Sequence, residues 1–321
     1  MFELSVSCDG RDTAQQFLEK VEAADRGRAR SLWIANHLFL RDPITLSAVA
    51  LSRASSISIA LMAVSPFTVH PVQAVMAAAT LDEMFPGRVT LCFGAGAPAD
   101  LNALSIDGSK PLRIMRETLK IAKALLQGET VRYEGEHFSI SSRSLVIGAR
   151  NVPIVLAASG PGMLELAGAE ADGVLISAGA SVPFVKQTLE HVQRGAKGRH
   201  VQTHGLVYSS IDDNERTAND RLRRVLSILL RGPHHRANLD AAGSRLDQEK
   251  LNRAVLDNDW QTAESLITDD IVRQHTASGT PSQVAERFEM YRAAGLDDVV
   301  IAGVRDATQI SSLLKIGGSK P

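Results

Sequence analysis

The sequence predicts an α/β protein folded as a parallel (β/α)8 barrel. Along its 321 residues, short apolar runs rich in β-branched residues alternate with segments of helical periodicity. The segment 57–98 shows this unit most completely, because it contains a strand, a helix, a second strand and a glycine cluster. Eight such strands fit a closed barrel better than a doubly wound sheet of roughly five to seven strands.

The first half of the chain predicts four strands, each followed by a helix. Ile57, Ile59 and Leu61 alternate with small residues, and the run stops before Pro66, which cannot donate to a sheet. Pro43 suits the first turn of a helix, and Pro86-Gly87 ends another. The expected strands cover residues 2–8, 31–35, 57–64 and 89–93, and the expected helices cover 13–25, 43–53, 72–84 and 112–126.

The second half repeats this alternation with two interruptions. Residues 131–140 form two β-rich pieces around a glycine, which predicts a hairpin outside the barrel. The stretch 214–276 is helical and irregular, and we interpret it as a lid inserted in a single domain of residues 1–321. The remaining expected strands are 153–158, 173–178, 200–210 and 297–303, with helices at 163–169, 183–194 and 281–294.

Composition excludes several classes of protein. The formal net charge is −1, so no overall field would attract nucleic acid or an anionic membrane. The two cysteines, Cys8 and Cys92, do not form a CxxC motif or a Cys/His cluster, so we expect neither a disulfide framework nor a metal site. The chain shows no secretory leader and no run of about 18 apolar residues, which favours a cytoplasmic protein.

The active site of such a barrel lies at the carboxyl ends of its strands. The motif ASGPGM at 158–163 leaves one strand and enters a helix there, where free backbone N–H groups favour a phosphate. A tight turn that needs glycine for its geometry alone is the alternative. The glycines after residue 93 lack the dinucleotide fingerprint and favour a flat ring packed on bare backbone.

Several motifs in the same order resemble the bacterial luciferase-like superfamily. They are SLWIANH (31–37), SPFTVHP (65–71), LDEMFPGRVTLCFGAG (81–96), VRYEGEHF (131–138), the run 152–177 and SGTPSQVAERF (278–288). In length and spacing the chain is similar to the compact members that resemble methylenetetrahydromethanopterin reductase. Those members use the deazaflavin coenzyme F420, whereas others in the superfamily use reduced FMN, and the resemblance leaves the choice open.

The resemblance implies a cofactor in the pocket at the carboxyl ends of the strands. The cofactor-binding residues that it implies are Asn36, Met62, Ala63, Val64, Ser65, His70, Gly94, Ala95, Gly96, Ser159, Gly160, Pro161, Gly162 and Met163. It also implies a non-prolyl cis peptide at Met62-Ala63, behind the flavin ring. From its position, His70 is expected to cap the helix that follows it.

His37 and Asp100 are the candidate catalytic residues. An imidazole at the position of His37 can move a proton near neutral pH, although Asn36 stands where the family has an acid. Asp100 lies close to the place of a catalytic glutamate in some deazaflavin relatives. The alternatives are a histidine bonded to backbone and a solvated loop aspartate.

The resemblance implies a flavin-type oxidoreductase that transfers hydride to, or uses molecular oxygen on, a small organic substrate. A flavin reductase would be its partner if the cofactor is FMN, and pairing of two barrels through their second and third helices predicts a homodimer or higher homo-oligomer. A non-catalytic flavin-binding protein with a decayed site is the alternative. The Arg-rich run 221–236, which includes His234-His235, suits either an anion-binding surface or a helix with one charged face.

Overall fold

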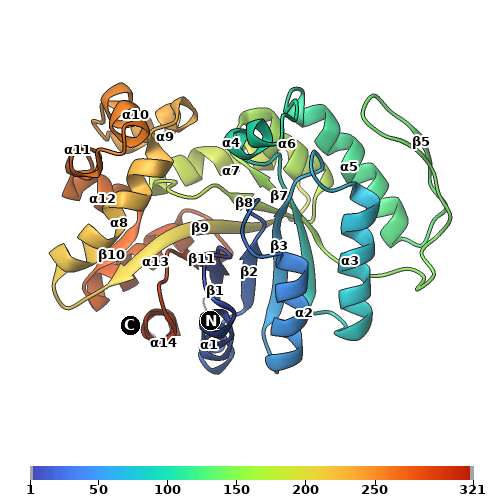
Figure 1. Cartoon of the computed structure of the whole chain (residues 1–321), viewed down its shortest axis with the longest axis horizontal. Coiled ribbons are helices and arrows are strands. Elements are labelled where there is room, and N and C mark those ends of the chain that lie inside the picture. The colour runs from blue at the N-terminus through green and yellow to red at the C-terminus, as the bar shows by residue number, and fades with distance from the viewer. Residues whose placement is uncertain (1–2, 319–321) are drawn as a thin grey trace.

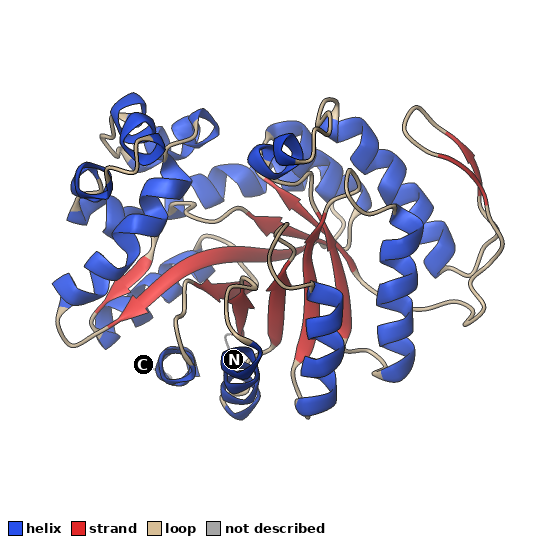
Figure 2. Ribbon diagram, in the orientation of Figure 1, coloured by secondary structure: helices blue, strands red, loops and turns tan. Residues whose placement is uncertain are grey.

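The computed structural model describes residues 3–318, with side chains for residues 4–316. Within this range eight parallel strands close into a barrel with helices around it, as the sequence predicts (Figures 1 and 2). The barrel strands are β1 (Glu3–Cys8), β2 (Ser31–Ala35), β3 (Ser58–Val64), β4 (Val89–Phe93), β7 (Ile154–Ala158), β8 (Gly173–Ile176), β9 (Gln202–Ile211) and β11 (Asp298–Ala302). Strand β9 closes the barrel because it pairs with both β8 and β11.

The outer layer consists of helices whose ends follow local capping rules. Thr13 forms a capping box with Gln16 at the start of the first helix, and the side chain of Asp42 accepts from the Thr45 N–H at the second. The helices that pack around the barrel are α1 (Ala14–Arg26), α2 (Pro43–Arg53), α3 (Pro71–Met84), α5 (Pro111–Leu126), α6 (Pro161–Glu170), α7 (Val182–Ala196), α8 (Glu215–Leu230), α13 (Pro281–Ala293) and α14 (Ala307–Gly318).

Two further parts lie outside this regular alternation. The hairpin of β5 (Arg132–Glu134) and β6 (Ser139–Ser141) stands at the edge of the molecule, outside the barrel (Figure 1). After α8 come η1 (Pro233–His235), α9 (Arg236–Ala242), α10 (Gln248–Leu256), α11 (Trp260–Leu266) and α12 (Asp269–His275). These helices and α8 share an apolar core of their own, which includes Leu226, Leu239 and Leu251. That residues 214–276 act as a lid within a single domain stays a prediction.

Side chains of alternate strand residues fill the barrel interior. Trp33, Cys92 and Val300 are buried there, together with Met62 and Leu175. A larger apolar layer lies between the strands and the surrounding helices. The interior is therefore packed with side chains, and a cavity lies above them, at the carboxyl ends of the strands.

Some elements escaped the sequence analysis. They are α4 (Pro98–Ala103), β10 (Ala277–Gly279) and α14, and the first two are too short to show a period. The expected start of the first strand at residue 2 lies outside the described residues. Within residues 3–318, none of the helices combines the length and the apolar character needed to cross a membrane.

The expected cis peptide at Met62-Ala63 is wrong. Every peptide bond among the described residues is trans. The bulge itself is present, because the register between β3 and β4 shifts between Leu61 and Val64. The trans backbone accommodates this register shift and keeps its hydrogen bonds to both neighbouring strands. The Met62 carbonyl accepts from the Asn36 N–H, and the Val64 carbonyl accepts from the Gly94 N–H.

Candidate active site

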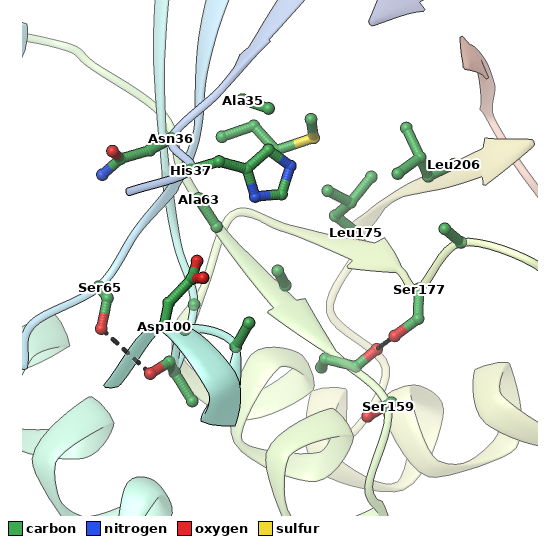
Figure 3. A pocket seen from close by; sticks show the side chains of 18 of the residues that line it. Ala35, Asn36, His37, Ala63, Ser65, Asp100, Ser159, Leu175, Ser177 and Leu206 are labelled. Carbon is green, nitrogen blue, oxygen red and sulfur yellow. Dashed lines mark hydrogen bonds between the residues drawn. The ribbon is translucent and has the colours of Figure 1, made fainter. Parts of the chain in front are cut away.

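A cavity of about 450 Å³ opens at the carboxyl ends of β2, β3, β4, β7, β8 and β9 (Figure 3). Leu175 and Leu206 form part of its apolar wall, and the small residues Ala63 and Gly94 also line it. Of the residues predicted for the site, those that line it are Asn36, His37, Met62, Ala63, Ser65, Gly94, Ala95, Gly96, Asp100 and Ser159. Small side chains thus leave room for a flat ring against the backbone.

The loops after β3 and β4 form one wall of this cavity. The Ser65 hydroxyl donates to the Ala95 carbonyl at 3.0 Å and accepts from the Phe67 N–H at 3.3 Å. A Cβ atom placed on Gly94 would lie 2.8 Å from the Cβ of Ala63, so only glycine fits there. Gly96 has a φ of +87°, a conformation that other residues rarely adopt. The glycine cluster is therefore required by the contact between the two loops.

The two candidate catalytic side chains both point into the cavity (Figure 3). His37 follows β2 and is exposed, whereas Asp100 lies in the first turn of α4 and is half-buried. The side chain of Asn36 points away from the His37 ring in Figure 3. An imidazole and a carboxylate in one apolar cavity can hold and transfer a proton beside a bound substrate.

Other predicted residues lie at the margin of the cavity. Gly160 is the N-cap residue of α6, and Pro161, Gly162 and Met163 form its first turn, next to the lining residue Ser159. No side chain caps this helix end within the described residues. An N-terminus of this kind can accept an anion through its backbone N–H groups.

Val64 and His70 do not line the cavity. Val64 is buried in the layer between strands and helices. The Nδ1 atom of His70 accepts from the Val72 N–H at 3.2 Å, and its ring meets the Phe138 ring edge-on with centroids 5.0 Å apart. His70 therefore caps α3, as the sequence analysis expected of it.

The sequence analysis missed several residues of the site. Leu229, His234 and His235 reach the cavity from the segment after β9. Leu175 and Leu206 line it from β8 and β9. The two leucines could have been found from the inward-facing positions of their strands. The two histidines could not have been found, because they lie far along the sequence from the other lining residues. No local pattern indicates that they reach the cavity.

The arginines of the run 221–236 lie elsewhere. Arg221 pairs with Asp212 at 2.6 Å, Arg224 with Glu264 at 2.6 Å, and Arg223 with both Asp220 and Asp269. No arginine or lysine among the described residues lines the cavity. Of the two sequence interpretations, the structure favours a helix with one charged face.

Comparison with known proteins decides the family. The profile of the luciferase-like monooxygenases matches residues 3–298. The chain belongs to this family. It is 28% identical to the 5,10-methylenetetrahydromethanopterin reductase of Archaeoglobus fulgidus over 89% of this chain and 88% of that protein. This confirms the resemblance that the sequence motifs carry.

Solved structures show the same fold. The coenzyme F420 dependent tetrahydromethanopterin reductase of Methanopyrus kandleri superposes with a TM-score of 0.89 at 22% identity, covering 98% of this chain and 97% of that one. The oxygenating constituent of a diketocamphane monooxygenase from Pseudomonas putida, solved with FMN, superposes with a TM-score of 0.70 at 16% identity, covering 98% and 97%. The family assignment makes the chain an oxidoreductase of the luciferase-like type. The solved structures that share its fold include a coenzyme F420 dependent enzyme and an enzyme solved with FMN.

Proposed function

We propose that the protein transfers hydride between coenzyme F420 and a small organic substrate in the cavity above β2, β3 and β4. One observation carries the proposal. His37 and Asp100 face a cavity whose wall at 94–97 is bare backbone and alanine, which leaves space for a flat ring beside two groups that can exchange a proton. The relative from Methanopyrus kandleri is named as coenzyme F420 dependent, and this favours F420 over FMN.

The residues present fit such a cofactor. Bound F420 would supply the hydride, and the protein would supply position and protons. The trans bulge at Ala63 and the backbone from Gly94 to Ala97 would support the ring, and the first turn of α6 at 160–163 would receive the phosphate. His37 or Asp100 would deliver the proton that accompanies the hydride when a substrate double bond is reduced, and would accept it in the reverse direction.

Cofactor titration and turnover test this proposal. Purified protein is titrated with F420 and with FMN, and the reduced complex is then offered oxygen and candidate acceptors. We expect tight binding of F420, no oxygen consumption, and oxidation of reduced F420 by an acceptor. Oxygen consumption with reduced FMN and a flavin reductase would show that the protein is a monooxygenase instead. Tight binding without oxidation by any acceptor would show that the site is decayed.

We also propose a homo-oligomer, formed through α2 and α3. Met76 and Met84 on α3 have exposed fractions of 52% and 62%, and Val49 on α2 has 39%. Apolar side chains of this size are usually buried, and their exposure on α2 and α3 suits contact with a second copy. Gel filtration at two concentrations, with M76E as the interface variant, tests this. A monomer at both concentrations would contradict it.

The cytoplasm is the compartment that we propose. Cys8 and Cys92 are both free and buried, which suits a reducing environment. Fractionation of cells that express the tagged chain would check this, and recovery outside the cytoplasmic fraction would contradict it.

A further inference from the structure

A second cavity of about 480 Å³ continues outward from the first. Seven residues line both cavities, among them Ser159, Ser177, His234 and His235, so the histidine pair stands at the junction. The outer cavity is completed by Pro98, Ala180, Phe184 and Asn238. Under the proposed function the cofactor ring would occupy the inner cavity, which leaves the outer one for substrate.

His235 is buried at this junction without a polar partner. Its exposed fraction is 8%, and its ring packs on that of His234 with centroids 4.4 Å apart. Among the described residues, neither of its ring nitrogens has a hydrogen-bond partner. A buried imidazole normally finds such a partner within the protein. The ring nitrogens of His235 are thus available to hydrogen-bond a molecule that enters the cavity.

The neighbouring His275 provides a contrast. Its Nδ1 donates to the Gly179 carbonyl at 2.8 Å, and its Nε2 shares a hydrogen bond of 3.0 Å with the Ser244 hydroxyl. Both ring nitrogens are satisfied inside the protein. His275 therefore holds the helical segment in place, whereas His235 keeps its hydrogen-bonding capacity for something that enters the cavity.

The backbone around His235 is anchored to the barrel. The Asn238 side chain accepts from the Ser181 N–H at 2.9 Å and donates to the Gly179 carbonyl at 2.8 Å. The Gln248 amide donates to the Gly232 carbonyl at 2.8 Å, on the other side of η1. The imidazole of His235 is consequently held at a defined place over the loop that follows β8.

The charges at the junction select against ions. No lysine, arginine, aspartate or glutamate among the described residues lines the outer cavity. Burial, together with smaller effects of His234 and His275, lowers the pKa of His235 to about 4, so the ring is neutral near pH 7. A neutral imidazole offers one N–H donor and one acceptor, which match a carbonyl or a hydroxyl oxygen rather than a carboxylate or phosphate.

We propose that His235 is a specificity-determining residue that hydrogen-bonds a hydroxyl or carbonyl oxygen of an uncharged organic substrate in the outer cavity. The inference rests on the proposed function for the placement of the cofactor, and it names the class of substrate. The apolar part of that substrate would pack on Phe184, Ala180 and Pro98.

Binding measurements with neutral and anionic probes of the same shape test this. Cyclohexanol, cyclohexanone, benzyl alcohol and acetophenone are titrated into F420-saturated protein and into cofactor-free protein, with cyclohexanecarboxylate and benzoate as the anions. We expect at least one neutral probe to bind, and both anions to bind about tenfold more weakly or not at all. H235F should weaken the neutral probe about tenfold, and H235N should recover most of that loss.

The imidazole ¹⁵N resonances supply a second readout. A bound neutral probe should shift the resonances of His235, assigned by their loss in H235N, and leave those of His275 unchanged. H200F, at an exposed position before β9, is the control for altered folding. The inference is overturned if no neutral probe binds, if H235F binds it as wild type does, or if the anions bind as tightly. Failure of the proposed function is separate, because it appears as loss of cofactor binding or turnover while the probe titration of cofactor-free protein still reports on His235.

Discussion

The hydroxyl group of Ser65 donates to the carbonyl oxygen of Ala95 at 3.0 Å and so joins the loop after β3 to the loop after β4. In S65A this link is lost, and the Phe67 N–H loses its acceptor as well. We expect the dissociation constant of F420 to rise about three- to tenfold, because one buried hydrogen bond contributes about 1 kcal/mol. Fluorescence titration measures this, and S52A, at an exposed serine of α2, should bind as wild type does. Equal affinity in S65A would show that the link does not support the cofactor.

The contact between Gly94 and Ala63 predicts a compensating pair of substitutions. G94A should displace the bulge, because its Cβ would lie 2.8 Å from that of Ala63, and cofactor affinity should fall about tenfold or more. A63G removes the Cβ atom with which the new methyl group of G94A would clash. The double variant should therefore bind the cofactor more tightly than G94A alone. The test is a double-mutant cycle on the cofactor dissociation constant. Additive losses in the double variant would contradict the prediction.

His37 and Asp100 should affect turnover more than binding. Both side chains point into the cavity, and loss of a general acid or base typically costs about a hundredfold or more in rate. We therefore expect at least one of H37Q and D100N to lower kcat by about a hundredfold or more, while cofactor affinity stays within about threefold in both. Steady-state kinetics and cofactor titration separate the two effects. If both variants keep the wild-type kcat, neither His37 nor Asp100 is a catalytic residue.

Lys20 should be important for stability. Its Nζ donates to both carboxylate oxygens of Asp12 at 2.8 Å and to the Val304 carbonyl at 2.9 Å, and only 4% of the residue is exposed. K20M leaves a partly buried carboxylate unpaired, so we expect the free energy of unfolding to fall by about 3–5 kcal/mol. Urea unfolding measures it. R26M, which breaks the exposed pair with Glu22, should cost less than about 1 kcal/mol.

His235 and His275, which are both buried, predict a loss of stability in mild acid. Burial lowers the pKa of His235 to about 4, helped by His234, and it lowers that of His275 to about 4, helped by Arg287 and opposed by the Gly179 carbonyl. The unfolded chain binds these protons below about pH 6.5, and the folded chain does so only near pH 4. The free energy of unfolding should therefore fall as the pH drops from about 6.5 to 4.

Unfolding of H235N and H275N at pH 7 and pH 5 checks this expectation. Each variant should lose less stability than wild type over that interval, by roughly 2 kcal/mol at most. H200N controls for the removal of an exposed imidazole. If H235N and H275N lose as much stability between pH 7 and pH 5 as wild type does, protonation of these two rings does not cause the pH dependence.

Much of the site could be predicted from the sequence because its residues follow strands. Once the alternation of strands and helices predicts a closed parallel barrel, all strand ends lie on one rim, so His37 and Gly94 were expected to lie near each other. Local rules were also sufficient at His70, where a polar side chain precedes a proline at a helix start. The trans peptide at Met62-Ala63 could not be read from the motif, because the register shift that accommodates it depends on the pairing with β4.

The amino-acid sequence by itself determined the barrel, its family and the strand-end residues, since period, turn chemistry and motif order are local properties. Only the tertiary structure decided which residues of the segment after β9 reach the cavity at the strand ends. His235 reaches the cavity because Asn238 and His275 bind the loop at Gly179, and the arginines of α8 face acids instead of the site. Such contacts join segments distant in sequence, and they depend on shape and on hydrogen-bond partners that no periodicity encodes.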